Sequence, residues 1–305
     1  MSLTLIYEGV DITSKVNIRQ CVHDMYGEKH ADTLLLKFSN SAGLWDKWNP
    51  KPGDNVEITD GNIRSGTMFV KKIEPMSGFF TIRASSIPVS ASVHYSQAWE
   101  EITKLQLAND ISKKHGLKLK TFGITDRKFS YLKQSSMNDL EFFENICVLE
   151  GDAFLIYDKC MIFYNEKYLE TQNISNTIVI SGANKFHYEE QMSYSGCTIR
   201  NESKEFTYRS TEEYEYLAEK TIQMHISSDG DAERYAKNML RYLNKEKKKG
   251  YFYVKPHLSD YAAGSVVRLK TSDTESYDGI AFITHIRHDF SNGMSKIFFR
   301  TIQEE

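Results

Sequence analysis

One pattern of glycines and apolar residues occurs near both ends of the chain. In the N-terminal copy the positions are Gly53, Val56, Ile58, Gly66, Val70, Ile73, Gly78 and Ile82; in the C-terminal copy they are Gly264, Val267, Leu269, Gly279, Ile283, Ile286, Gly293 and Ile297. The separations agree at three, two, four, three and four residues and differ only where a loop between strands would lie. Each copy predicts a glycine turn, a strand, a loop, a longer strand, a tight turn and a further strand. We therefore expect two related small antiparallel β-barrels, with the six glycines at structural turn positions.

Alternation of apolar and polar residues predicts short strands throughout the N-terminal part of the chain. The runs are 16–22, 33–38, 55–59, 68–73 and 79–83, and clusters of Gly, Asn, Ser and Asp separate them. The turn-forming segment between the second and third runs carries Trp45 and Trp48, which we expect to be buried anchors.

The middle of the chain has a helical period instead. Apolar side chains recur every three residues from Trp99 to Ile111, which predicts one helix from residue 96 to Lys114. A capping box at 136–139 predicts the start of a second helix, which Gly151 ends. The apolar runs that follow, 153–157 and 160–164, predict a β-hairpin.

Beyond residue 170 the pattern returns to strands and then to one more helix. The runs 177–180 and 194–200 read as strands, and an amphipathic helix begins near Asp229 or Asp231. The lysines of 245–249 follow this helix, where they are expected to complement its C-terminal dipole.

These patterns predict an α+β, mainly β fold, with two related small antiparallel β-barrels flanking an α+β middle region. The predicted segments are an N-terminal barrel over 1–92, an α+β domain of two helices and a hairpin over 93–170, a β-rich segment with an amphipathic helix over 171–250, and C-terminal strands that complete the second barrel over 251–305.

Composition excludes several classes of protein. The 305 residues carry 38 basic and 41 acidic side chains, a formal net charge of −3, so no strong field exists to hold nucleic acid or an anionic membrane. No secretion signal or apolar span is evident, so we expect synthesis in the cytoplasm and no membrane or sequence-specific nucleic-acid partner. The four cysteines are far apart, which favours buried thiols over disulfides or a zinc site.

The common catalytic and metal-binding motifs are absent from the sequence. His285 and His288 are three positions apart in a predicted strand and would point to opposite faces. Cys147 lies beside an apolar helix stripe, where a thiol is inert filling. The carboxylate pairs Glu100–Glu101, Glu189–Glu190 and Glu212–Glu213 are sequence neighbours, which do not face each other across a substrate. We expect no catalytic, cofactor-binding or metal-binding residues.

Several segments, taken in order, resemble the late control gene D proteins, the baseplate hub proteins of contractile phage tails. The sequence is most similar to the versions from Gram-positive prophages. The segments that carry the resemblance are 35–40, 48–56, 98–116, 134–146, 231–236 and 264–301.

The resemblance implies a structural hub protein in the tail baseplate of a phage or phage-like particle. In that family three subunits with two barrels each form a ring of six barrels, which joins a sixfold tail tube to a threefold central spike. The implied partners are two further copies of the chain, the tube and spike proteins, other baseplate proteins and a tape-measure protein. The sequence lacks the lysozyme-like or peptidase domain that some larger members carry, so wall degradation would come from another chain.

Two alternatives remain open at this level. One is a cell-wall hydrolase subunit of the tail, which the missing motifs oppose. The other is a carbohydrate-binding β module in which Trp45, Trp48 and Trp99 would serve as stacking platforms for sugars.

Overall fold

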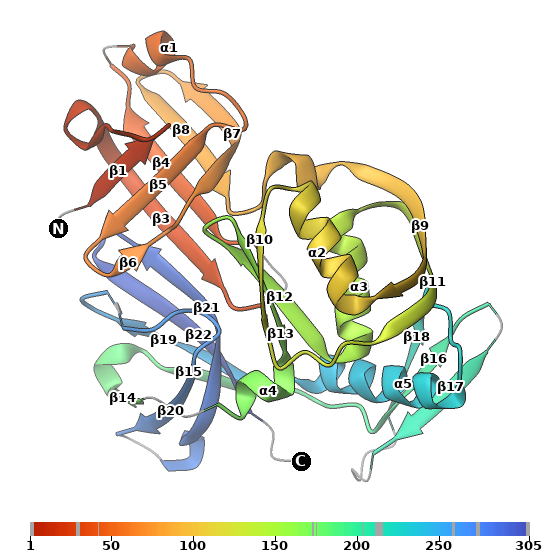
Figure 1. Ribbon diagram of the computed structural model, residues 1–305. Coiled ribbons are helices and arrows are strands. Elements are labelled where there is room, and N and C mark those ends of the chain that lie inside the picture. Colours follow the sequence, from red (N-terminus) through yellow and green to blue (C-terminus); the bar gives the residue numbers. More distant parts are fainter. Residues whose placement is uncertain are drawn as a thin grey trace.

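The computed structural model shows two β units side by side and an α+β region that packs against them (Figure 1). It describes residues 3–28, 31–41, 43–172, 174, 176–202, 204–210, 216–257, 260–272 and 275–302. The predicted fold class is confirmed: the chain is α+β and mainly β, with antiparallel β units before and after the α+β region.

The N-terminal unit is a curled antiparallel sheet in the order β3-β4-β8-β7-β5-β1-β2. Its strands are β1 (Thr4–Tyr7), β2 (Val10–Asp11), β3 (Asn17–Tyr26), β4 (Thr33–Ser39), β5 (Asn55–Asp60), β6 (Ile63–Arg64), β7 (Met68–Met76) and β8 (Phe79–Ser85). Alternate residues of each strand point into one core, which the short helix α1 (Leu44–Trp48) plugs with Trp45. Trp45 stacks on Phe80 at 5.1 Å between ring centroids, so this tryptophan is the buried anchor that the sequence predicts.

The middle region covers its strands with helices. Its elements are β9 (His94–Thr103), α2 (Lys104–Lys114), β10 (Lys118–Phe122), β11 (Lys128–Asn138), α3 (Asp139–Glu150), β12 (Asp152–Tyr157), β13 (Cys160–Asn165) and α4 (Glu166–Glu170). The predicted hairpin is confirmed as β12 and β13, joined by Asp158 and Lys159, which both have positive φ angles.

The predicted helix from residue 96 is wrong in its first part. Residues His94 to Thr103 form β9, which pairs with β11, and the helix begins only after Thr103. Thr103 fixes this start because its Oγ1 accepts a hydrogen bond from the Gln106 amide, while the Gln106 side chain accepts one from the Thr103 amide. Trp99 and Ile102 matched the helical period by coincidence.

The second helix is also capped differently from the prediction. Ser136 lies in β11, and Asn138 is the cap, with its Oδ1 accepting a hydrogen bond from the Glu141 amide at 2.9 Å. Asp139 does not reach back to the cap. It is buried and accepts hydrogen bonds from the ring of His115 at 2.8 Å and from Gln134 at 3.0 Å.

The C-terminal unit forms the rest of the large sheet and contains an insertion. Its strands are β14 (Thr177–Ile180), β15 (His187–Glu190), β19 (Lys248–Val254), β20 (Val266–Thr271), β21 (Gly279–Asp289) and β22 (Met294–Thr301). Between β15 and β19 lie β16 (Gly196–Arg200), β17 (Glu205–Arg209), β18 (Leu217–Thr221) and helix α5 (Asp229–Asn244). Strands β14 and β15 thus belong to the second unit although the segment 171–250 was predicted as a region of its own.

The lysines after α5 have partners that the sequence did not predict. Lys245, the C-cap residue of α5, is buried and pairs with Glu28, at 2.7 Å, and with Glu166. Lys248 and Lys249 lie in β19 and pair with glutamates of β15. These three lysines therefore neutralise specific carboxylates.

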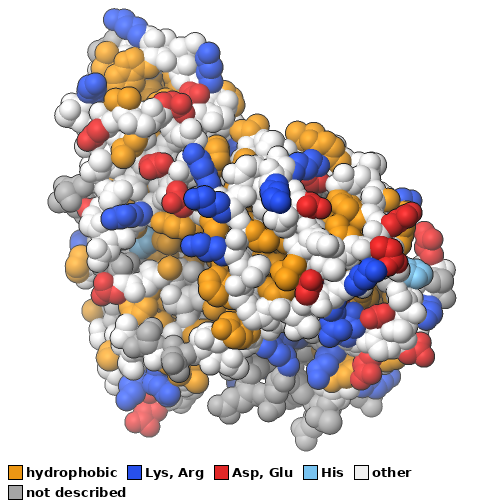
Figure 2. Space-filling model, viewed as in Figure 1, with side chains coloured by type: hydrophobic (Ala, Val, Ile, Leu, Met, Phe, Trp, Pro, Cys, Tyr) orange, Lys and Arg blue, Asp and Glu red, His pale blue; other side chains and the backbone are white. Residues whose placement is uncertain are grey.

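Within the described residues, no helix is long and apolar enough to cross a membrane. Basic and acidic side chains are interspersed on the face shown in Figure 2, without a field of one sign.

Candidate assembly surface

The two β units repeat each other strand by strand. Six strands correspond in chain order: β1 with β14, β3 with β15, β4 with β19, β5 with β20, β7 with β21 and β8 with β22. In both units the neighbours within the sheet follow the same sequence, from the β3 equivalent through the β4, β8, β7 and β5 equivalents to the β1 equivalent. The correspondence of topology extends beyond the segment in which the sequence repeat is visible.

Hydrogen bonds at the glycine turns are reproduced bond for bond. The Gly53 amide donates to the Val70 carbonyl at 2.8 Å, and the Gly264 amide donates to the Ile283 carbonyl at 2.8 Å. In return, the Val70 amide donates to Asp54 at 2.8 Å and the Ile283 amide donates to the residue after Gly264 at 2.9 Å. Gly53 has a φ angle of +99° and Gly264 one of +93°, a backbone conformation that favours glycine.

A β-bulge occupies the same place in both units. The register between β7 and β8 shifts after Val70, and the register between β21 and β22 shifts after Ile283. Past the bulge, Ile73 faces Ile82 in one unit, and Ile286 faces Ile297 in the other. These four isoleucines are repeat positions of the sequence, so the repeat reflects matched cross-strand pairs.

The six predicted turn glycines are not equivalent in backbone conformation. Five have positive φ angles, and Gly279, which begins β21, does not. Its counterpart Gly66 has φ +60°, and a Cβ there would lie 2.7 Å from the Cβ of Asp158. The first unit therefore needs glycine at this position because the hairpin of the middle region packs against it.

The two units are joined edge to edge through β3 and β21. The antiparallel ladder runs from Tyr26 opposite His285 to Val22 opposite Asp289. Across it His285 contacts Asp24, with Nε2 and Oδ1 2.8 Å apart. Such a joint turns two units into one 14-stranded sheet.

The joint also buries two histidines that face each other. His23 and His288 are 0% and 1% exposed and their rings stack at 6.2 Å. Burial lowers the pKa of His23 to about 4 and that of His288 to about 3, so both rings are neutral at pH 7. His285 lies within the joint, in β21, and is a sheet residue, as the sequence predicts.

A row of rings crosses the C-terminal unit on the other face of the sheet. Tyr26, His285, Phe298, Tyr251 and His187 come from five neighbouring strands, β3, β21, β22, β19 and β15. Successive ring centroids are 4.3, 4.6, 5.8 and 4.9 Å apart. The row continues without interruption from the joint to β15.

Two of the unpaired strand edges in the described part of the chain correspond to the two strands of the joint. From Lys72 to Met76, β7 pairs with β8 on one side only, because β5 pairs with β7 no further than Phe69. Strand β15 pairs with β19 on one side only. In the strand correspondence, the first edge is the equivalent of β21 at the joint and the second is the equivalent of β3.

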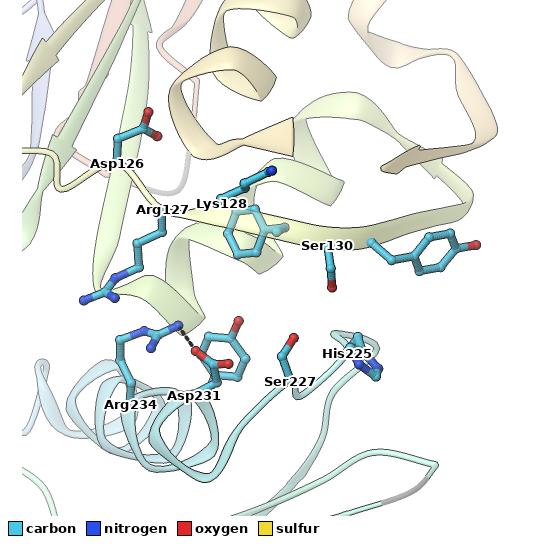
Figure 3. A pocket seen from close by; sticks show the side chains of 11 residues that line it. Asp126, Arg127, Lys128, Ser130, His225, Ser227, Asp231 and Arg234 are labelled. Carbon is cyan, nitrogen blue, oxygen red and sulfur yellow. Dashed lines mark ion pairs between the residues drawn. The ribbon is translucent and has the colours of Figure 1, made fainter. Parts of the chain in front are cut away.

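A polar pocket of about 270 Å³ lies between β11 and the start of α5 (Figure 3). Its charged side chains are held by structural partners: Arg234 pairs with Asp231 at 2.9 Å and with Glu150 at 3.0 Å, and Asp126 accepts a hydrogen bond from the amide of Leu105 at the start of α2. These contacts hold α5 against α3 and hold the segment before β11 against the start of α2.

The side chains considered above as candidates for catalysis or metal binding have structural roles. All four cysteines are buried, and burial raises the thiol pKa of Cys21 to about 12 and of Cys197 to about 11, and that of Cys147 well above its usual value. No group of three or more His, Cys, Asp or Glu side chains within the described ranges could hold a metal ion.

Three members of the predicted carboxylate pairs have cationic partners. Glu189 and Glu190 pair with Lys249 at 3.5 Å and Lys248 at 3.2 Å, and Glu101 pairs with Lys128. Glu212 and Glu213 lie outside the described residues.

The prediction that Trp48 is a buried anchor is wrong, because this side chain remains on the surface. Trp45 is 2% exposed, Trp99 lies flat against Phe142 at 5.0 Å, and Trp48 is 40% exposed. The three indole rings therefore do not form a common platform for a sugar.

Comparison of the whole fold with solved structures finds tail proteins. A tail protein from Neisseria meningitidis MC58 superposes with a TM-score of 0.76 at 10% identity, over 98% of this chain and 96% of that one. The 43 kDa tail protein of prophage MuSo2 from Shewanella oneidensis gives 0.71 at 13% identity, with 98% and 96% covered. This chain has a phage tail protein fold. No protein-family model and no curated protein sequence matches it.

The same fold occurs in a secretion apparatus. An E. coli component of the type VI secretion system, described as similar in structure to the phage T4 tail proteins gp27 and gp5, superposes with a TM-score of 0.66 at 12% identity. The match covers 98% of this chain and 77% of that one. The tail protein fold thus accounts for all regions of the present chain, including the α+β middle.

Proposed function

We propose that this chain is a structural hub protein of the baseplate in a contractile phage tail or tail-like particle. In this role three copies form a ring that joins the sixfold tail tube to the threefold central spike. The relationship we propose is to the late control gene D proteins of Gram-positive prophages, on the sequence segments named above.

The observation that carries the proposal is the duplication of a six-strand unit within a chain of tail protein fold. A ring that meets sixfold and threefold neighbours needs two related units in each of three subunits. The repeated glycine turns, bulges and isoleucine pairs supply those two units in a single chain.

The proposed partners follow from that role. They are two further copies of this chain, the tail tube protein, the central spike protein and other baseplate proteins, with a tape-measure protein passing through the ring. The interspersed surface charges and the net charge of −3 suit a passage that does not retain nucleic acid.

We further propose that the chain has no catalytic activity of its own. The buried thiols, the engaged carboxylates and the structural ion pairs of the polar pocket support this. Incubation with purified peptidoglycan tests it, because clearing above a buffer control would favour the cell-wall hydrolase alternative.

The decisive experiment is a measurement of mass in solution, followed by mixing with tube and spike proteins from the same tail. We expect a trimer of 35.2 kDa subunits that binds both partners. A monomer at all concentrations that joins neither partner would refute the hub role.

A further inference from the structure

We propose that neighbouring subunits of the ring are joined by strand pairing between the β7 edge of one copy, residues 72–76, and the β15 edge of the next, residues 187–191. This inference rests on the proposed trimer and assigns its contact to two named edges. The joint would repeat, between chains, the β3–β21 joint that exists within the chain.

The correspondence between the two units determines the register. The cross-strand pairs make Lys72 equivalent to His285 and make Glu189 equivalent to Asp24. Since Asp24 faces Arg287 within the chain, Glu189 faces Glu74 of the next copy. By the same equivalence, Gln191 would lie opposite Lys72, because Tyr26 faces His285 within the chain.

Both edges are available for this pairing. In the described part of the chain each has a strand on one side only. Met76, at the end of the β7 edge, is 61% exposed, and Met192, just past the β15 edge, is 73% exposed. Large apolar side chains at the end of an unpaired strand are a liability in a monomer and are usual at an interface.

Two carboxylates would face each other across the joint. Glu74 would lie opposite Glu189, and like charges directly opposite each other weaken a ladder. Each carboxylate has a cation on its own chain, since Glu74 pairs with Arg83 at 3.0 Å and Glu189 with Lys249 at 3.5 Å. These pairs reduce the repulsion across the joint, so the attraction between chains must come from the backbone hydrogen bonds of the ladder and from the apolar side chains at its ends.

Two side chains limit the length of the joint. Pro75, the equivalent of His288, has no amide hydrogen and removes one bond from the ladder. At the other end, Met192 corresponds to Gly27, where a Cβ would lie 2.6 Å from the Gly264 amide nitrogen. The pairing therefore ends at Gln191, and the joint between chains is shorter than the joint within the chain.

Engineered disulfides test the register directly. In an antiparallel ladder, side chains are closest in pairs of residues that do not hydrogen-bond to each other, and such pairs alternate with hydrogen-bonded ones. The Phe290 amide donates to the Cys21 carbonyl, so Phe290 and Cys21 are a hydrogen-bonded pair. Counting back along the ladder, Arg287 opposite Asp24 is a pair without mutual hydrogen bonds. Its equivalent is Glu74 opposite Glu189. We would oxidise the full chain carrying Glu74→Cys and Glu189→Cys, with Lys72→Cys and Gln191→Cys as a second pair.

The matched control is Glu74→Cys with Glu190→Cys. One residue of displacement turns the second side chain to the opposite face of the strand, so this pair should not cross-link. Native cysteines are buried and serve as an internal background in all three variants.

The expected result is a non-reducing gel with cross-linked species that stop at three chains for both test pairs and are absent from the control. A trimer by mass that yields no disulfide from either pair overturns the assigned edges and leaves the hub proposal intact. A monomer with no disulfide overturns both. Cross-linked species longer than three chains support the joint and refute the closed trimer.

Discussion

The N-terminal and C-terminal β units share a strand plan and differ in what fills it. The first packs its core around Trp45, supplied by a helix between two strands, whereas the second packs phenylalanines such as Phe252 and Phe299 from the strands themselves. The bulges and glycine turns are the same in both. Backbone hydrogen bonding is therefore the common element, and the apolar filling is adapted in each unit separately.

The units also differ in what they carry. A short connection links β3 to β4, while the equivalent strands β15 and β19 are separated by a three-stranded sheet and α5. Strand β1 is antiparallel to β5, but β14 is parallel to β20. These changes lie at the ends of the shared strand order, where β14 and β15 each have one neighbouring strand, whereas most of the length of the central strands is paired on both sides.

Lowering the pH should affect the β3–β21 joint within the chain differently from the proposed joint between chains. The pKa of His288 falls from an ordinary 6.5 to about 3 on burial, so stability is full above pH 6.5 and is lost as the pH falls toward 3. His23, with a pKa of about 4, acts in the same direction, but Asp32, whose pKa burial raises to about 7, gains stability on acidification and offsets it. We expect a net loss on the order of 5 kcal/mol between pH 7 and 3, measured by urea unfolding.

The groups facing His288 include His257 and the nearby Asp289, besides His23 and His285. His288→Gln should flatten the pH profile, whereas a profile as steep as that of the parent would contradict the assignment. Disulfide formation between chains should be insensitive to this substitution, because Pro75 replaces His288 in the proposed joint.

Removal of the tryptophan plug should affect the first unit alone. Trp45→Ala is expected to cost about 3–5 kcal/mol of unfolding free energy, because it empties a site that is 2% exposed. Trp48→Ala, in the same helix and 40% exposed, should cost about 1 kcal/mol. Chemical denaturation of both variants measures the difference, and equal losses would show that the helix, not the ring, is what matters.

Matched glycine substitutions test the equivalence of the turns. Gly53→Val and Gly264→Val should each cost about 1–3 kcal/mol, because a β-branched residue is strained at a φ of +99° or +93°. Thermal unfolding monitors both. If one variant melts as the parent does, its turn is not the conformational counterpart of the other.

The smallest change in stability is expected at Gly279, whose backbone conformation differs from that of its counterpart Gly66. Gly279→Ala has no atom within 4 Å of the new Cβ and an ordinary backbone, so we expect a change within about 0.5 kcal/mol. Gly66→Ala meets the Asp158 Cβ at 2.7 Å and should cost about 1–3 kcal/mol. A larger loss for Gly279→Ala than for Gly66→Ala would reverse the distinction drawn between the two units.

Much of the fold could be predicted because strand alternation and helix periods are local. Five strands of the first unit, β3, β4, β5, β7 and β8, lie where the patterns place them, as do the hairpin of β12 and β13, β14 and α5, whereas the short strands β1, β2 and β6 were not predicted. The sequence period failed at β9, where the half-buried Trp99 and the buried Ile102 imitate a helix, because apolar residues three apart in a strand have no local signature. Only the pairing with β11 decides it.

The joint between the units could not be found by this means. The predicted strand ended at Val22 because His23 and Asp24 look polar, yet β3 continues to Tyr26. The apolar character of Cys21 and Met25 on one face was the available signal. What buries His23 is a strand more than 250 residues away, and no local pattern reports a partner at that distance.

The buried cluster around Lys245 bears on how the molecule could be divided. Glu28 at the end of the first unit and Glu166 of α4 both contact Lys245, and Arg300 of β22 lies 3.6 Å from Glu28 and 2.7 Å from Glu170. A fragment cut from the chain at any junction between regions would expose or orphan part of this set, at a cost of several kcal/mol. Although its two β units share a strand plan, the protein is therefore expected to fold as one piece. Exchange of segments with a related tail protein should succeed only when all of these charged residues are exchanged together.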